Sequence, residues 1–394
     1  MDYRQLFRKL DGNLEGLKAG PAGLSALLGR LVEDFKDDLG IVGGRLYRKR
    51  GEFYVLREEY PAGHTPKGFR LPVDYPPLQE LLQQGFSLHD LGDPGVDRAL
   101  EEPLVRENTF AAIALREPPL VLAFSLKPGA QREQVVYTLN TLRHVLSLKL
   151  RKDQLEDGVA QVRSIQLSLL PANAPRFADY DLWARMQPAE EVGGDLYDFI
   201  RVGERQLGIA IADSAGHGLP AALQARDAII GLRMGVEERL RLTATVEKLN
   251  KVISRSALSS RFISLFYGEL EPGGNLVYCN AGHNPPLLWR GGAFEELSRG
   301  GLVLGPNPEA QYERGYATLV PGAVLVAYTD GIVEAEDAQG EQFGTARLRE
   351  LIAGRRFGSA RELTEAVFAA VVAFSGRETP RDDQTVLVAL RPTG

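Results

Sequence analysis

The sequence predicts an α+β protein in which two packed β-sheets carry helices on their outer faces, preceded by a smaller α/β domain and a long helix. The chain has 394 residues, which is enough for two domains of ordinary size. Residues 131–170 contain almost no helix breaker, so they predict one long helix. Later strand candidates such as "FISLFYGEL" are apolar on both sides of their alternation, which is typical of sheets covered on both faces.

The first segment, residues 1–150, alternates helical and strand-like patterns. A helix is expected around "GLSALLGRLVEDFKDDLG", strands at "IVGGRLYRKR" and "EFYVLREEYP", a short helix near "PPLQELLQQG", and a hairpin from "FAAIALREPP" and "LVLAFSLKPG". This order resembles a GAF-type sensor domain, and a PAS-like sensor is the alternative. Residues 1–150 contain no cysteine, which excludes a thioether-linked chromophore but leaves a non-covalent ligand open.

The long helix begins near Gln131 and has apolar residues at three- and four-residue steps. These are Val135, Leu139, Leu142, Val145 or Leu146, Val159, Val162, Ile165 and Leu169. The helix either packs on its own domain or forms a two-helix seam between protomers, which would make the protein a homodimer. We expect Gly158 to interrupt the helix and "LPANAPRF" to end it, so that residues 151–174 form a linker.

Residues 175–394 alternate strands and helices without repeats. Strands are expected at "YDLWARMQ", "DLYDFIRV", "RQLGIAIADS", "RFISLFYGEL", "NLVYCNAGH", "PPLLWRGG", "AVLVAYTDG" and "QTVLVAL". Helices are expected at "LPAALQARDAIIGLRMGVEERL", "ATVEKLNKVISRSA", "GTARLRELIAG" and "SARELTEAVFAAVVAF".

Composition excludes several classes of protein. The formal charge is −6 and no dense Lys/Arg cluster occurs in the sequence, so neither nucleic acid nor a membrane surface is an expected partner. No apolar run approaches the roughly 20 residues of a membrane span, and we expect a cytoplasmic protein. The single cysteine, Cys279, leaves too few thiols for a zinc cluster and is expected to be buried in a strand.

Aspartates recur where strands meet turns, and they predict a site for metal ions. Asp195 follows two glycines, Asp213 and Asp330 end apolar strands, and Asp382 and Asp383 open the last strand. Each aspartate alone is compatible with an ordinary turn. Together, carboxylate oxygens without thiols are the ligand set that Mg²⁺ or Mn²⁺ prefers over zinc.

Five motifs occur in order: "PAEEVGGDLYDF", "ADSAGHGLPAAL", "NAGHNPPLL", "YTDGIVEAED" and "RDDQTVLV". They resemble the metal-dependent serine/threonine protein phosphatases (PPM), in the bacterial branch of stage II sporulation and Rsb-type sigma-factor regulators. The resemblance implies an α-β-β-α sandwich and a signal-transduction hydrolase. It also implies a protein substrate, namely a phosphorylated STAS-type anti-sigma-factor antagonist, and an activator or ligand for the sensor.

The same resemblance assigns roles to individual residues. It implies two Mn²⁺ or Mg²⁺ ions, held by the carboxylates of Asp195, Asp213, Asp330 and Asp382 and by the backbone carbonyl of Ser214. These ions would activate a water for in-line attack on phosphorus without a phosphoenzyme. The step "RDD" leaves two candidates for the last ligand; the family pattern favours Asp382 and gives Asp383 a capping role. Glu191 is expected to hydrogen-bond a metal-bound water.

Three alternatives accompany this interpretation. "GGD" also resembles the turn of diguanylate cyclases, but the long pattern of strands and helices after it does not fit that class. A pseudophosphatase that acts as a signal-dependent binding module would be indicated by missing carboxylates, and all four are present. His217 lies four residues after Asp213 and is either a general acid or a loop residue. His283 is expected to brace a hairpin through Asn280 and Asn284.

Overall fold

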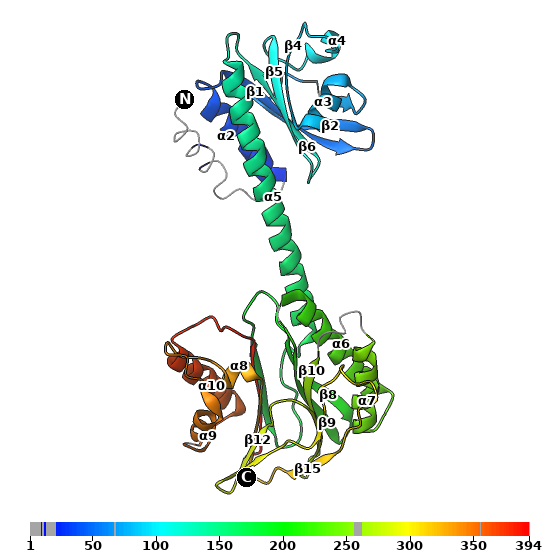
Figure 1. Ribbon diagram of the computed structural model, residues 1–394, viewed down its shortest axis with the longest axis vertical. Coiled ribbons are helices and arrows are strands. Elements are labelled where there is room, and N and C mark those ends of the chain that lie inside the picture. The colour runs from blue at the N-terminus through cyan, green and yellow to red at the C-terminus, as the bar shows by residue number, and fades with distance from the viewer. Residues whose placement is uncertain are drawn as a thin grey trace. The chain divides into compact units, whose positions relative to one another are not determined.

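The computed structural model describes residues 9, 12, 21–66, 68–216, 218–255, 262–354 and 356–393. The chain divides into two compact units, Met1–Gly158 and Val159–Gly394, and each is described by itself (Figure 1). Among the described residues, no helix has the length and apolar character that a membrane span needs.

The first unit is built on a six-stranded antiparallel sheet with the order β3-β2-β1-β6-β5-β4. Its strands are β1 (Ile41–Arg50), β2 (Phe53–Tyr60), β3 (Arg70–Pro72), β4 (Phe86–Asp90), β5 (Thr109–Leu115) and β6 (Leu120–Leu126). Its helices are α2 (Pro21–Phe35), α3 (Pro76–Gln84), α4 (Arg98–Glu101) and the first part of α5 (Arg132–Leu169). The predicted elements are present, whereas β3, β4 and α4 are too short to have been expected.

Both faces of this sheet are buried, and side chains alternate between them. Ile113 and Leu122 pack with α2 and α5 in one core, while Ala112 and Val121 pack with Leu78 of α3 in the other. Because successive residues of a strand point to opposite faces, one strand contributes to both cores. This explains why these strands are almost continuously apolar.

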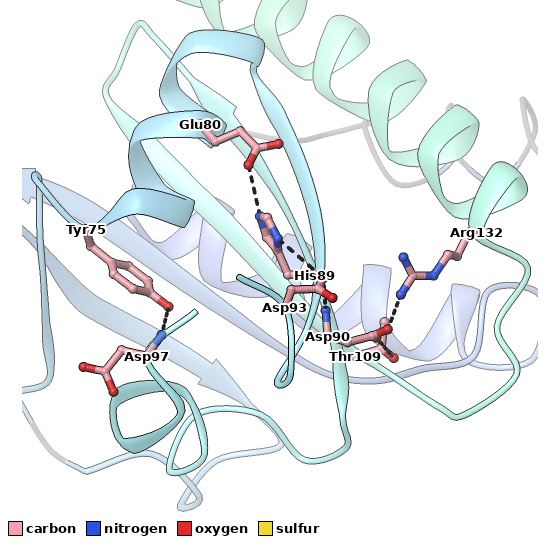
Figure 2. Close-up of polar contacts among 8 residues, drawn as sticks. All are labelled: Tyr75, Glu80, His89, Asp90, Asp93, Asp97, Thr109 and Arg132. Carbon is pink, nitrogen blue, oxygen red and sulfur yellow. Dashed lines mark hydrogen bonds and ion pairs between the residues drawn. The ribbon is translucent and has the colours of Figure 1, made fainter. Parts of the chain in front are cut away.

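Helix α5 is anchored to the first unit by its first five turns. Val135, Leu139, Leu142, Leu146 and Leu150 are all buried in the core beside α2. In addition, Arg132 at the start of α5 donates to Asp90 at the end of β4, and Asp90 also accepts a hydrogen bond of 2.6 Å from Thr109 (Figure 2).

The prediction that Gly158 interrupts this helix is wrong. Helix α5 continues through Gly158 to Leu169. A single glycine in a helix costs only about 1 kcal/mol relative to alanine. Better helix formers lie within three residues on both sides, namely Leu155 and Glu156 before it and Ala160 and Gln161 after it. The prediction that the Pro-containing segment ends the helix is confirmed, since α5 stops two residues before Pro171.

The second unit contains two antiparallel-rich sheets. One has the order β14-β11-β10-β9-β8 with β15 paired to β11, and the other β13-β12-β16-β17-β7. The strands are β7 (Asp181–Gln187), β8 (Asp195–Gly203), β9 (Gln206–Ser214), β10 (Ile263–Leu270), β11 (Asn275–Ala281), β12 (Leu287–Arg290), β13 (Ala293–Glu296), β14 (Gly300–Gly301), β15 (Gly315–Thr318), β16 (Val324–Tyr328) and β17 (Gln384–Leu390). The helices are α6 (Gly218–Glu237), α7 (Leu242–Ser254), α8 (Asp330–Val333), α9 (Gly344–Gly354) and α10 (Ala360–Ser375).

The two sheets pack face to face with helices outside, as Figure 1 shows. Ile211 of β9 and Leu387 of β17 lie in the core between the sheets. Their neighbours point outwards: Ala212 packs under α6 and α7, and Val386 packs under α9 and α10. The predicted α-β-β-α sandwich is therefore confirmed. The short strands β13, β14 and β15 and the one-turn helix α8 were not predicted.

Candidate metal centre

Asp195 and Asp213 face each other across two adjacent strands. Asp195 is the first residue of β8, and the antiparallel register pairs it directly with Asp213 near the end of β9. Directly opposed residues have Cβ atoms about 4.5–5.5 Å apart and project to the same face of the sheet. Asp195 is 1% exposed. The hairpin therefore brings two carboxylates together at its open end, one of them fully buried.

Two threonines from the opposite sheet hold the Asp195 carboxylate. The hydroxyl of Thr329 donates to Asp195 Oδ2 at 2.7 Å, and the hydroxyl of Thr385 donates to the same oxygen at 2.6 Å. The backbone N–H of Thr385 in turn donates to Thr329 Oγ1 at 2.9 Å. These contacts join both sheets at the site. They were not predicted from the sequence, although both threonines lie within two residues of a candidate aspartate.

Asp330 and Asp382 approach from the second sheet. Asp330 follows β16 and opens α8, with Thr329 as the N-cap residue. Asp382 lies just before β17, is exposed, and accepts a hydrogen bond of 2.8 Å from the N–H of Asp383. The predicted position of each aspartate at a strand end is confirmed.

The neighbouring Asp383 is buried and holds the loop that precedes β8. Its carboxylate accepts from the N–H of Ala189 at 2.8 Å, from the N–H of Gly194 at 2.5 Å, and from the N–H of Asp195. A carboxylate with three backbone donors is committed to its own loop. Of the adjacent pair, Asp382 therefore has the carboxylate that is accessible to an ion.

Three glycines at the site are needed because the backbone comes close to other atoms. A Cβ on Gly193 would lie 2.6 Å from Asp383 Oδ2, and one on Gly194 would lie 2.7 Å from the carbonyl oxygen of Ser214. A Cβ on Gly331 would lie 2.1 Å from the carbonyl oxygen of Asp383. None of these distances can accommodate a side chain. Glycine is therefore required at these positions, because only a residue without a Cβ allows this close backbone approach.

The carboxylates repel one another, and burial strengthens the effect. Burial, followed by the charge of Asp213, raises the pKa of Asp195 well above its usual range. The pKa of Asp213 is raised to about 7, first by burial and then by the charges of Asp330, Asp382 and Asp383. Burial and the charge of Asp382 also raise the pKa of Asp330. The four candidate ligands therefore share one electrostatic environment that favours a bound cation.

The donor set fits a hard divalent cation. All the groups that converge are oxygens, and a cluster of like charges of this kind is stabilised when a cation neutralises it. Within the part of the chain that the structure describes, no group of three or more His, Cys, Asp or Glu side chains is arranged to coordinate an ion by itself. Other ligands, such as water and backbone carbonyls, would have to complete the coordination shell. Mg²⁺ commonly uses one or two carboxylates and completes its shell with water, so cross-strand pairs of carboxylates are suitable.

Ser214 directs its side chain away from the aspartates. It is completely buried, and its hydroxyl donates to Gln224 of α6 at 3.0 Å. Its N–H donates to the carbonyl of Gly194 at 3.2 Å, which leaves the backbone carbonyl of Ser214 as the group that a metal ion would use. Glu191 is exposed and pairs with Arg163 of α5 at 2.9 Å.

The last turns of α5 contact the loop that carries Asp195. Gln166 donates from Nε2 to the carbonyl of Gly193, and its Oε1 accepts from the N–H of Gly193 at 3.3 Å. One side chain therefore bonds both backbone polar groups of Gly193, the residue two positions before Asp195. No local pattern predicts this contact beyond the position of Gln166 in a long helix.

The remaining polar candidates have structural roles or lie outside the described residues. His283 is buried. Its backbone N–H donates to Asn280 Oδ1 at 2.7 Å, and its ring Nδ1 contacts Ser264 Oγ at 2.7 Å. Burial lowers the pKa of His283 to about 4, so it braces the hairpin as a neutral imidazole. Cys279 is buried in β11, and burial raises the pKa of its thiol to about 12. His217 lies outside the described residues.

The α-β-β-α sandwich and the carboxylates at its edge define the second unit as a protein phosphatase domain of the PP2C type. Residues 203–392 match the family described as stage II sporulation protein E (SpoIIE).

Relatives agree with this assignment. The chain is 26% identical over 243 residues to "Phosphoserine phosphatase RsbU" of Bacillus subtilis, covering 61% of this chain and 72% of that protein. It is 24% identical over 328 residues to "Protein IcfG" of Synechocystis, covering 73% of this chain and 51% of that protein. Its fold is similar to the "SiaA-PP2C domain of Pseudomonas aeruginosa", with a TM-score of 0.54 and 22% identity over 60% of this chain and 97% of that domain.

Proposed function

We propose that this protein hydrolyses phosphoserine or phosphothreonine on a protein substrate with two Mn²⁺ or Mg²⁺ ions. The carboxylates of Asp195, Asp213, Asp330 and Asp382 and the backbone carbonyl of Ser214 would hold the ions. The observation that carries the proposal is the cross-strand pair of the buried Asp195 and the partly buried Asp213, whose pKa values are raised by burial and by neighbouring carboxylates. Buried carboxylates that repel one another lower the stability of the folded protein unless a bound cation neutralises them.

The chain's own residues position the reacting groups. When bound, two divalent ions supply a nucleophilic water at neutral pH and neutralise charge on the phosphoryl group. Thr329 and Thr385 fix Asp195, and Asp383 fixes the loop before it, so the ligands are preorganised. A thiol nucleophile is not needed, and buried Cys279 does not supply one.

Hydrolysis of a phosphoserine protein tests the reaction. We expect activity that depends on Mn²⁺ or Mg²⁺, and losses of at least a hundredfold in Asp195→Asn and Asp330→Asn. Glu204→Gln is a matched control, because Glu204 is exposed in the turn at the other end of the β8–β9 hairpin. Binding of Mn²⁺ measured by calorimetry should be lost in parallel. Full activity with a chelator, or in either aspartate variant, would contradict the two-metal proposal.

The proposed substrate is a phosphorylated STAS-type anti-sigma-factor antagonist. The motif resemblance and the similarity to the phosphoserine phosphatase RsbU support this class. Initial rates on a folded phosphorylated STAS domain should exceed those on a phosphopeptide of the same sequence, because a folded partner contacts more of the surface around the site. Equal kcat/KM values for the two would refute a preference for the folded partner while leaving the phosphatase reaction intact.

We further propose that α5 regulates the phosphatase and pairs with its equivalent in a homodimer. Leu148, Leu155, Val159 and Ile165 are between 38% and 66% exposed on α5, and the first two lie seven residues apart, the repeat of a two-helix seam. The hydrogen bonds between Gln166 and Gly193 provide the physical contact with the metal-binding loop.

Deletion of residues 1–160 tests both parts of the regulatory proposal. We expect a changed phosphatase rate and a monomer in sedimentation analysis. In the full chain, Gln166→Leu should shift the Mn²⁺ concentration for half-maximal activity, since it removes both bonds to Gly193. The exposed Gln161→Leu on the same helix is the control. An unchanged rate together with an unchanged oligomeric state would refute the proposal.

A further inference from the structure

The first unit contains a cationic cleft that the phosphatase reaction does not use. The cleft has a volume of about 320 Å³ and lies where the end of β1, the end of α3, the β5–β6 turn and α5 meet. Four cationic side chains line it: Lys49, Arg116, Arg143 and Arg151. Glu117 is its one acidic lining residue. Lys49 and Arg116 are far in the sequence from the two arginines of α5, and folding brings the four cations to one place.

These four cations have no ion-pair partner among the residues that the structure describes: no carboxylate oxygen lies within 4.0 Å of their charged nitrogens. Elsewhere on α5 the cations are paired, as in the contacts of Lys149 with Asp153 at 2.9 Å and Lys152 with Glu156 at 3.5 Å. A concave surface that gathers unpaired charges of one sign attracts ions of the other sign.

Arg143 is the most constrained of the four. Its Nε atom is buried and has no hydrogen-bond partner. Its guanidinium lies directly against Gly85, where a Cβ would be 2.0 Å from Arg143 Nη1. Gly85 is the left-handed C-cap of α3, with a φ of 81°. The guanidinium is therefore held in place by packing at the wall of the cleft.

We propose that this cleft binds a small phosphorylated molecule of nucleotide size that carries at least two negative charges. Guanidinium groups match phosphate oxygens in pairs of parallel hydrogen bonds. The volume is at the lower end of the range for small-molecule sites. Tyr54, Leu82 and Leu115 add an apolar wall, which suits a ring beside the phosphates. A partly enclosed cleft of this size does not fit a duplex or a bilayer surface.

The position of the cleft gives such a ligand a route to act on α5. Arg143, Ser147 and Arg151 are on α5, whereas Lys49 is on β1 and Arg116 is in the β5–β6 turn. A bound polyanion would therefore connect α5 to β1 and to the β5–β6 turn. This binding site is independent of the proposed phosphatase reaction and would exist whether or not the metal centre is active.

Calorimetry with the full chain tests the proposal. ADP, pyrophosphate and inorganic phosphate are titrated at low salt in the presence of a chelator, so that the metal centre does not contribute. We expect saturable binding of ADP and pyrophosphate that weakens with added salt. Arg143→Gln and Arg151→Gln should each weaken it about tenfold or more. Arg48→Gln removes the same charge from an exposed position on β1 outside the cleft and should have little effect.

Three outcomes would overturn the proposal. The first is the absence of saturable binding of ADP and pyrophosphate at millimolar concentration. The second is equal weakening in Arg151→Gln and Arg48→Gln, because that would show a general charge effect; Arg151 is exposed, so this variant is expected to fold. The third is binding of anionic lipid vesicles without binding of ADP. Phosphatase activity of the same protein preparations, measured with Mn²⁺ in place of the chelator, would show separately whether the metal centre functions.

Discussion

Asp382 and Asp383 are adjacent, yet the structure predicts opposite effects when each is changed to asparagine. The Asp382 carboxylate is exposed and raises the pKa of Asp330 and Asp213 by its charge. The Asp383 carboxylate is buried and accepts three backbone N–H groups of the loop before β8. Asp382→Asn should abolish the metal-dependent reaction without lowering stability, whereas Asp383→Asn should lower stability.

The magnitude for Asp383→Asn follows from its donors. The asparagine oxygen can replace one carboxylate oxygen, but its NH₂ group then faces a backbone N–H in place of the other oxygen. One buried N–H left without an acceptor costs about 1–3 kcal/mol. Removing a carboxylate whose pKa is raised by burial offsets part of this cost. We therefore expect the free energy of unfolding to fall by about 1–2 kcal/mol.

For Asp382→Asn the sign is reversed in the metal-free protein. The variant removes one negative charge from beside Asp213 and Asp330, so the free energy of unfolding should rise slightly, by less than about 1 kcal/mol for an exposed group. The assay is urea denaturation in chelator for both variants, followed by phosphatase activity at saturating Mn²⁺. If Asp382→Asn keeps full activity, or Asp383→Asn is as stable as the wild type, the assignment of ligand and loop anchor is wrong.

Three further predictions concern stability. Because the folded pKa of Asp213 is about 7 and the unfolded value is near 4, the folded metal-free protein binds the extra proton. The unfolding free energy in chelator should fall by about 2–4 kcal/mol from pH 4 to 8, and Asp213→Asn should reduce this difference without abolishing it, because Asp195 and Asp330 also have raised pKa values. Gly331→Ala would place a Cβ 2.1 Å from the Asp383 carbonyl oxygen, so the melting temperature should fall by about 5 °C or more. A melting temperature within about 1 °C of the wild type would refute this contact. Arg233→Met leaves the buried carboxylate of Asp198 without its ion-pair partner at 2.8 Å. The free energy of unfolding, measured by urea denaturation, should fall by about 2 kcal/mol. This loss is smaller than for a fully buried pair because Arg233 is 42% exposed.

Much of the fold could be predicted because the second unit buries both faces of both sheets. In β9, Ile209 and Ile211 face the other sheet while Ala210 and Ala212 face helices, so the sequence is a continuous apolar run that is typical of such strands. The short strands could not be predicted in the same way. Gly300–Gly301 has no side chain to show alternation and pairs with β11 only because the backbone of Asn280 lies against it.

The metal-site aspartates could be found from their positions at strand ends, but the groups that hold them could not. Thr329 and Thr385 contact Asp195 across 134 and 190 residues, and no local pattern reports which partner a hydroxyl will find after folding. The predicted interruption at Gly158 was wrong for a related reason. Local propensity at one glycine is outweighed by the helix formers on either side of it.

The choice between Asp382 and Asp383 shows what three-dimensional structure adds to a motif. The two side chains have different surroundings: the Asp383 carboxylate is buried against the loop before β8, whereas Asp382 is exposed. The sequence does not say which side is the interior at this point, because the segment before β17 has no regular pattern. The backbone N–H groups of Ala189 and Gly194 decide which aspartate points inwards. They require an acceptor, and the Asp383 carboxylate accepts from both. The need to satisfy buried backbone donors thus directs Asp382 towards the other carboxylates.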